Sequence, residues 1–220
     1  MRRFLWDNGL SVTLFALFVI SLVGQALTGW RAQIGELRLH ELPAIGFTDY
    51  LASGHFISAV FENWESEFLQ MAAYVLLTIF LFQKGASESK KPDEHNPEDE
   101  SPSARRNDPD VPWPVHRGGL LLKLYSHSLS IALVTLFLAS FWLHLAGSTR
   151  RMNEEALQHR QPPQTVMDTL AEPEFWYESF QNWQSEFLSI GVLLVLGIYL
   201  RQRGSPESKA VAAPHAATGH

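Results

Sequence analysis

The chain has no cysteine among its 220 residues. It therefore forms no disulfide, has no thiolate to bind a metal and uses no cysteine nucleophile. Cysteine usage does not indicate whether the protein lies in a reducing or an oxidising compartment. Basic residues are also few: 17 lysines and arginines stand against 23 aspartates and glutamates, and no basic patch is interleaved with aromatic side chains. We therefore expect no nucleic-acid partner.

The sequence also lacks the short motifs on which catalytic assignments usually rest. It has no Gly-x-Ser-x-Gly turn, no glycine-rich phosphate loop, no His-Glu-x-x-His helix and no dinucleotide fingerprint. We therefore predict that the protein is not an enzyme and has neither catalytic residues nor a cofactor.

Charged side chains are missing from residues 10–29 and 129–147. Each stretch is close to the ~20 residues with which a helix crosses a bilayer. Residues 68–82 and 187–200 are shorter, and they reach spanning length only if the helix includes the residues before them. The mean hydropathy of −0.05 averages these runs with charged segments and hides them. We predict an all-α integral membrane protein with four transmembrane helices and interfacial amphipathic helices.

One motif occurs twice. Phe-Glu-Asn-Trp-Glu-Ser-Glu-Phe-Leu at 61–69 returns as Phe-Gln-Asn-Trp-Gln-Ser-Glu-Phe-Leu at 180–188, an offset of 119 residues. At this offset the two halves align without a gap, and about a third of the paired positions are identical. The pattern predicts a tandem duplication of a two-helix unit. Because the first apolar run has an internal copy, we interpret it as a retained transmembrane helix rather than a signal peptide.

Two crossings return the chain to its starting side, so the two units have the same orientation. Most lysines and arginines flank the side that holds both termini and the central linker. The positive-inside rule therefore predicts that these parts are cytoplasmic and that the protein is a multi-pass inner (plasma) membrane protein whose first partner is the lipid bilayer.

Composition divides the chain into four segments. We predict a first membrane repeat at 1–86, a disordered acidic cytoplasmic linker at 87–117, a second repeat at 118–205 and a disordered tail at 206–220. Between the two helices of the first repeat, an outer loop is expected from Trp30 to about Val60, with a short helix capped by Thr48 and Asp49.

Polar side chains recur at helical spacing in the motif and in the outer halves of the apolar runs 10–29 and 129–147. If they turn away from lipid, they converge near the axis between the two repeats. The alternative is structural: the acids complement helix dipoles, the asparagines cap helices, and Gln25 and His144 make interhelical hydrogen bonds. The predicted polar cluster consists of Asn63, Ser66, Glu67, Asn182, Ser185, Glu186, Gln25 and His144.

Imidazole and carboxylate groups in the outer loops are chemically suited to zinc or manganese. Their spacings match no standard metal site, so we predict no metal, and local pairs of Arg31 with Glu36 and of Arg150 with Glu155 are the simpler interpretation. The residues concerned are Glu36, His40 and Asp49 and their copies Glu155, His159 and Asp168.

The duplicated motif, the Leu-Ser start of the first and third helices at Leu10 and Leu129, and the exits Lys84-Gly85 and Arg203-Gly204 resemble a family of bacterial inner-membrane proteins known only as a domain of unknown function. The resemblance covers nearly the whole chain before the tail. It implies a polytopic membrane protein and supplies no activity, substrate or catalytic residue.

Two functions fit these features. The first is a small permease, channel or envelope-stress component that handles ions or small solutes through the polar cluster. The alternative is a non-catalytic membrane scaffold that binds a protein partner through its cytoplasmic linker. Four helices with so few polar residues are narrow for a pore, so a homodimer is compatible with the first function.

Overall fold

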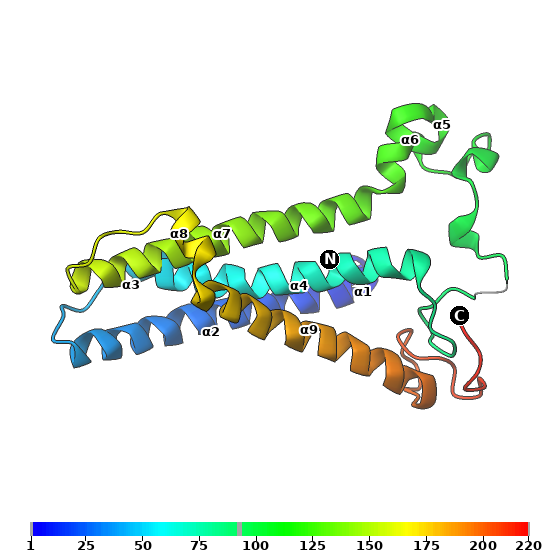
Figure 1. Cartoon of the computed structure of the whole chain (residues 1–220). Coiled ribbons are helices and arrows are strands. Elements are labelled where there is room, and N and C mark those ends of the chain that lie inside the picture. Colours follow the sequence, from blue (N-terminus) through cyan, green and yellow to red (C-terminus); the bar gives the residue numbers. More distant parts are fainter. Residues whose placement is uncertain (1, 92–93, 220) are drawn as a thin grey trace. The chain divides into compact units, whose positions relative to one another are not determined.

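The computed structural model describes residues 2–91 and 94–219 (Figure 1). Of the chain, 71% is helical, and the described residues contain no strand. The predicted all-α class is confirmed. The chain begins with a short helix, α1 (Arg2–Asp7), followed by the long helix α2 (Gly9–Leu39).

The long helices come in pairs of equal length. α2 and α7 (Ser128–Gln158) have 31 residues each and begin at positions 9 and 128, which are 119 apart. α4 (Gly54–Phe80) and α9 (Pro173–Tyr199) have 27 residues each and begin at positions 54 and 173, again 119 apart. Two short helices precede the second pair: α3 (Phe47–Leu51) and α8 (Val166–Ala171).

Within residues 2–91 and 94–219, two helices, α2 and α7, are long and apolar enough to cross a membrane. Only 6% of the most apolar window of α2 and 22% of that of α7 is buried inside the protein. A core helix of a soluble protein has most of such a window buried, because burial is what stabilises apolar surface in water. α4 and α9 do not reach the same apolarity, since their first halves contain the polar motif.

α2 continues beyond Trp30, where the sequence predicted a loop, and ends at Leu39. The added segment, Arg31–Leu39, is rich in strong helix formers and places Ile34 and Leu37 three positions apart on one face. α4 likewise begins at Gly54, before the predicted loop end at Val60.

α2 and α7 end in the same type of turn. The Leu42 amide donates to the Leu37 carbonyl and the Gln161 amide to the Ala156 carbonyl, both at 2.8 Å. The residues before these donors, Glu41 and Arg160, have φ of 58° and 55°. A six-to-one hydrogen bond closed by a left-handed residue is a Schellman motif, which satisfies the last carbonyls of a helix.

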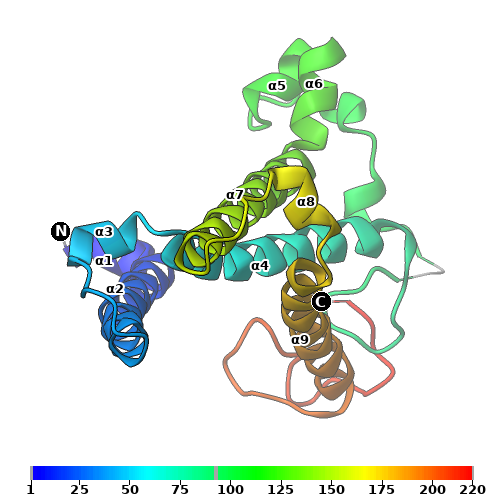
Figure 2. The same ribbon diagram turned by 60° about the vertical axis from the view of Figure 1, so that its left-hand side comes forward.

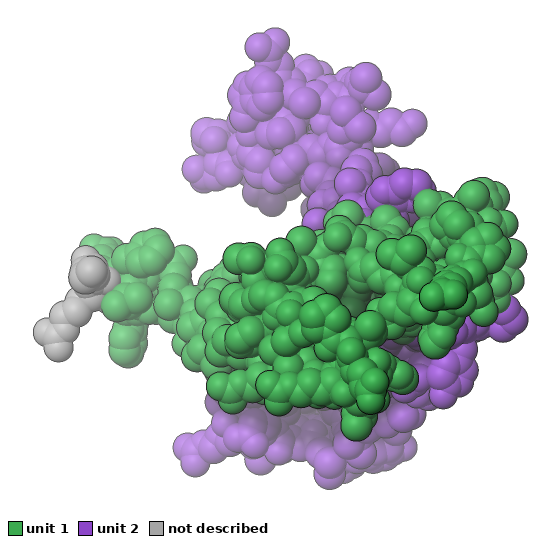
Figure 3. All heavy atoms as spheres, turned by 90° about the vertical axis from the view of Figure 1, so that its left-hand side faces the viewer, with its two compact units in different colours: residues 1–61, 143–172 green, residues 62–142, 173–220 purple. Residues whose placement is uncertain are grey.

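The chain forms two compact units, coloured separately in Figure 3. Unit 1 consists of residues 1–61 and 143–172, and unit 2 of residues 62–142 and 173–220.

Unit 1 packs around Tyr50 of α3, which is 2% exposed. Its ring lies against Phe56 at a centroid distance of 5.4 Å, and its hydroxyl lies at Gly29 of α2, where any side chain would overlap it. Burial raises the pKa of the Tyr50 hydroxyl. Beside it the indole of Trp30 donates to the Ile45 carbonyl at 3.0 Å, so the loop after α2 folds back onto that helix.

The start of α4 crosses the end of α7 at two glycines. A Cβ on Gly54 would lie 2.7 Å from the Gly147 carbonyl oxygen, and a Cβ on Gly147 would lie 2.5 Å from the Ser58 nitrogen. Small residues at a crossing let two helix backbones approach this closely. The crossing brings His55, the residue after Gly54, next to α7.

Unit 2 contains a cluster of aromatic rings between α7 and α9. Phe141 contacts Phe175, which is fully buried, at 5.6 Å, and Phe137 contacts Trp183 at 6.5 Å. Phe180 lies edge-on to Trp183 at 5.3 Å. These edge-to-face contacts fix the orientation of the Trp183 indole.

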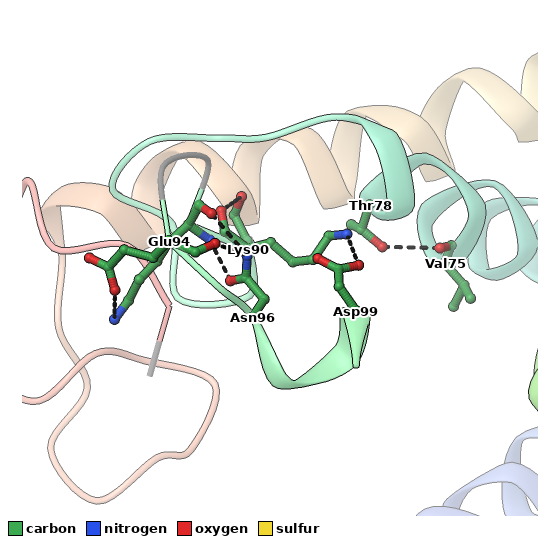
Figure 4. A network of polar contacts seen from close by, with 8 residues as sticks. Val75, Thr78, Lys90, Glu94, Asn96 and Asp99 are labelled. Carbon is green, nitrogen blue, oxygen red and sulfur yellow. Dashed lines mark hydrogen bonds and ion pairs between the residues drawn. The ribbon is translucent and has the colours of Figure 1, made fainter. Parts of the chain in front are cut away.

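The central segment of unit 2 contains the turns η1 (Pro97–Asp99) and η2 (Pro102–Arg105), followed by α5 (Trp113–Arg117) and α6 (Gly119–Ser126). α5 and α6 lie side by side in both ribbon views (Figures 1 and 2). Lys90 pairs with Asp99 at 2.8 Å, and the Asn96 side chain bonds to the backbone of the residues before it (Figure 4). The predictions of disorder in the linker and in the tail stay predictions.

The short helix predicted near Thr48 is present as α3, but its N-cap is Gly46, which has no side chain to cap with. α8 has a complete capping box instead: Thr165 Oγ1 accepts from the Asp168 amide, and the Asp168 carboxylate accepts from the Thr165 amide at 2.8 Å. The Thr165 hydroxyl also donates to the Asp168 carboxylate at 2.7 Å. The hydrogen bonds that this carboxylate accepts from the Thr165 amide and hydroxyl lower the pKa of Asp168.

We expect acid to weaken unit 1 through Asp168. A carboxyl whose pKa is lower in the folded state stabilises that state above its ordinary pKa near 3.9, and this contribution is lost as the pH falls through the lowered value. Thr165→Ala removes the hydroxyl but keeps the backbone amide, so it should reduce stability at neutral pH by about 1 kcal/mol and raise the Asp168 pKa only part of the way toward its ordinary range. Urea unfolding measures the loss of stability, and NMR titration of the Asp168 carboxyl carbon measures the pKa; an ordinary pKa in the wild type would contradict the capping box.

Candidate functional site

The predicted polar cluster divides between the two units. Asn63, Ser66 and Glu67 lie on α4 in unit 2. Ser66 is 1% exposed and donates to the Asn63 carbonyl at 2.8 Å, whereas the side chains of Asn63 and Glu67 are exposed. Glu65, which lies outside the predicted cluster, is fully buried beside Ser66.

α9 supplies hydrogen-bond donors to α4 within unit 2. The Trp183 indole donates to the Glu65 carboxylate at 2.8 Å, and the Asn182 amide donates to Glu62. Farther along, Gln70 donates to the Glu186 carbonyl at 2.8 Å and to the Ser189 hydroxyl at 3.3 Å. These bonds join the two copies of the motif, with carboxylates on α4 where α9 has the amides Gln181 and Gln184.

The remaining three residues of the cluster lie on α9, α2 and α7. Ser185 follows on α9, where its hydroxyl donates to the Asn182 carbonyl at 2.8 Å. Gln25 on α2 and His144 on α7 belong to unit 1; Gln25 is partly buried and His144 is fully buried. Convergence of all eight residues at one axis stays a prediction.

Unit 1 contains a polar cavity of about 310 Å³ at the C-terminal ends of α2 and α7. We call it the outer cavity, since this end is the one predicted to face outward. It is lined by Gln33, Glu36, Leu37, His40, His55, Arg151, Glu154, Glu155, Gln158 and His159.

The outer cavity collects the residues that the sequence offered as metal ligands, apart from the two aspartates. Glu36 and His40 are four positions apart at the end of α2, so they share one face of the helix turn. Glu155 and His159 repeat the arrangement at the end of α7. Asp49 and Asp168 are not among the lining residues, and Asp168 serves the capping box of α8.

The charge of the cavity wall is negative when its three histidines are neutral. Glu36, Glu154 and Glu155 contribute carboxylates against the single guanidinium of Arg151. Arg150, outside the lining, pairs with Glu154 at 2.8 Å, one position before the partner that the sequence predicted. The Glu154 carboxylate also lies 3.4 Å from the Gly54 amide at the start of α4.

Among the lining atoms, His55 Nδ1 and Gln33 Oε1 are buried without a hydrogen-bond partner among the described residues. Leaving a buried polar atom unpaired costs about 1–3 kcal/mol, so such atoms are normally satisfied by something. Since both line the cavity, a polar occupant is the natural partner for them.

Sequence reasoning missed six of the ten lining residues: Gln33, Leu37, His55, Arg151, Glu154 and Gln158. The signal for the other four was present in the repeated Glu-x-x-x-His spacing. It was interpreted as loop sequence because the helix was expected to end at Trp30.

The fold and the cavity define an all-helical protein with two helices long and apolar enough to span a membrane and a polar cavity at their C-terminal ends. The chain belongs to the family described as a domain of unknown function, DUF6766, which it matches over residues 1–220. A family of unknown function was expected from the duplicated motif, and this is confirmed. No curated protein and no solved structure matches the chain.

Proposed function

We propose that the protein is a bacterial inner-membrane protein with four crossings, formed by duplication of a two-helix unit. Three observations support the duplication: equal helix lengths, helix starts 119 residues apart in both pairs, and the same Schellman turn after α2 and α7. α4 and α9, with 27 residues each, are about 40 Å long at 1.5 Å per residue, which is enough to cross the ~30 Å hydrocarbon core with their polar motifs at its edge.

The exposed apolar surface of α2 supports a membrane as the surrounding medium. Leu10, Phe15 and Ile20 are each at least 67% exposed, and they point in different directions around the helix. A helix that is apolar on all sides and little buried in its own protein is stable in lipid but not in water. α7 lies far from the N-terminus, so a signal sequence does not account for both helices.

The proposed role is that of a small permease or channel that takes up an ion or small polar solute from the outer side. The observation that carries this proposal is the outer cavity, because it combines a solute-sized volume, a charged wall and two buried polar atoms without partners.

The orientation is tested by labelling. Because the chain has no cysteine, a single cysteine placed at Gly46 is the only thiol that a reagent can modify. A membrane-impermeant maleimide should label it from outside intact spheroplasts. Labelling only after the cytoplasmic face has been opened would overturn the orientation and place the cavity inside.

The transport role is tested by flux into proteoliposomes. Protons and common monovalent and divalent cations are compared for the wild type, for Glu36→Gln/Glu155→Gln, and for the linker control Glu98→Gln. We expect flux in the wild type and the control, with at least a tenfold loss in the cavity variant. Flux of none of these ions in the wild type would reject the permease role for them and favour the scaffold with its cytoplasmic linker.

A further inference from the structure

We propose that the outer cavity binds one divalent transition-metal cation of the zinc type between the Glu36/His40 pair and the Glu155/His159 pair. The inference deepens the proposed function by naming the ligand of its site. The binding itself does not depend on whether the ion is then transported.

The ligand set suits such an ion. Imidazole nitrogen and carboxylate oxygen are the donors that zinc, manganese and related metals take when no thiolate is available, and this chain has no cysteine. Two residues four positions apart on one helix can bind one ion together, because they lie on the same face. Here two helices each bring such a pair to the same cavity.

The field at this position favours a cation. Both pairs lie in the last turn of a long helix or just beyond it, where the helix dipole places its negative end. The cavity wall adds three carboxylates against one guanidinium. An anion would have to overcome both contributions, whereas a divalent cation is stabilised by both.

The cavity is not closed around a finished coordination sphere. No three ligand atoms of its histidines and carboxylates lie within 4.8 Å of one another in the part of the chain that the structure describes. Glu36, His40, Glu155 and His159 are exposed residues, so their side chains are able to rotate inward around an ion. The partly buried His55, with its unpaired Nδ1, offers a further donor from α4.

Arg151 sets a limit on the affinity. Its guanidinium lines the same cavity and repels a cation, so its removal should tighten metal binding. If the cavity instead bound an anion, the loss of Arg151 would weaken binding. The sign of the Arg151→Gln effect therefore distinguishes a cation site from an anion site.

The test uses the full chain, purified in detergent without a polyhistidine tag. Zn²⁺ is titrated by calorimetry at pH 7.5, and Co²⁺ absorption then reports the ligand geometry. We expect one ion per chain, at least a 100-fold loss of affinity in His40→Ala/His159→Ala, and an unchanged affinity in the control His95→Ala/His127→Ala.

Circular dichroism and gel filtration establish that each variant is folded, and the more conservative Glu36→Gln/Glu155→Gln provides a second test of the same site. Absence of binding at 100 µM Zn²⁺, or equal affinity in the cavity and control variants, would overturn the inference. Metal binding without flux would contradict the permease role and support the metal site. Flux without metal binding would support the permease role and contradict the metal site.

Discussion

Gly147→Ala is expected to break the packing of unit 1. The added methyl would lie 2.5 Å from the Ser58 nitrogen and 2.9 Å from its Cα, both backbone atoms of α4 that no side-chain rotation can move away. α4 and α7 must therefore separate, and overpacking of this kind costs about 1–3 kcal/mol or more. Gly54→Ala meets the backbone of residues 150 and 147 from the other side and should cost a similar amount. Thermal unfolding in detergent, followed by tryptophan fluorescence, measures both losses.

Two other glycines provide matched controls. Gly24 and Gly35, on α2, have nothing within 4 Å of an added Cβ. Alanine there should leave stability unchanged or raise it by up to about 1 kcal/mol, since alanine is the better helix former. A Gly147→Ala protein that melts with the wild type would show that the two helices do not cross at this point.

The same crossing shapes the outer cavity. Gly54 precedes the lining residue His55, and its amide lies near Glu154 of the cavity wall. If α4 moves away from α7, His55 moves with it. Gly147→Ala should therefore weaken ligand binding at the cavity as well as the fold, although no lining residue has been replaced.

Much of the fold could be predicted from the sequence because its strongest signals are local. An uncharged run such as 10–29 identifies a helix by itself, and the ungapped repeat predicts that its copy is a helix too. Helix ends were harder. The segment after Trp30 changes from apolar to charged, which indicates departure from the membrane, but helix propensity continues to Leu39 and the helix continues with it.

The outer cavity could be predicted only in part. The Glu-x-x-x-His pairs are visible at a fixed offset, yet their meeting depends on how α2, α4 and α7 pack in unit 1. His55 and Gln33 are not repeated in the second half of the chain, where the equivalent residues are Glu174 and Met152. Their role follows from three-dimensional proximity, which spacing along the chain does not contain.

The burial of Glu65 in the motif also escaped prediction. On an isolated helix, Asn63, Ser66 and Glu67 form one polar stripe, and the aromatic stripe was expected at the membrane surface. In unit 2 the rotation of α4 follows from what α9 offers: an indole N–H and an amide as donors. These select Glu65 and Glu62 as acceptors and leave Glu67 exposed. Two faces of α4 carry polar residues at helical spacing, so the sequence alone does not decide between them. The contacts with α9 decide which face is buried.

Trp183→Phe should reveal how much this pairing contributes. Phenylalanine retains an aromatic ring next to Phe180 and Phe137 but removes the N–H that bonds to Glu65, a residue with no exposed surface. A buried carboxylate that loses a donor costs about 1–3 kcal/mol. Urea unfolding in detergent should show this loss, whereas Trp142→Phe, at a residue that is 59% exposed, should change stability by less than about 0.5 kcal/mol.

A double-mutant cycle separates the hydrogen bond from the packing. Glu65→Gln keeps an acceptor oxygen but removes the charge that strengthens the bond, so its own cost should be smaller than that of Trp183→Phe. If the two groups interact directly, the effects of the single changes will fail to add, with a coupling of about 1 kcal/mol or more. Strict additivity would mean that Trp183 acts through the aromatic cluster alone. A measured coupling would show that the two copies of the motif hold each other in place, with Trp183 on α9 as donor and Glu65 on α4 as acceptor.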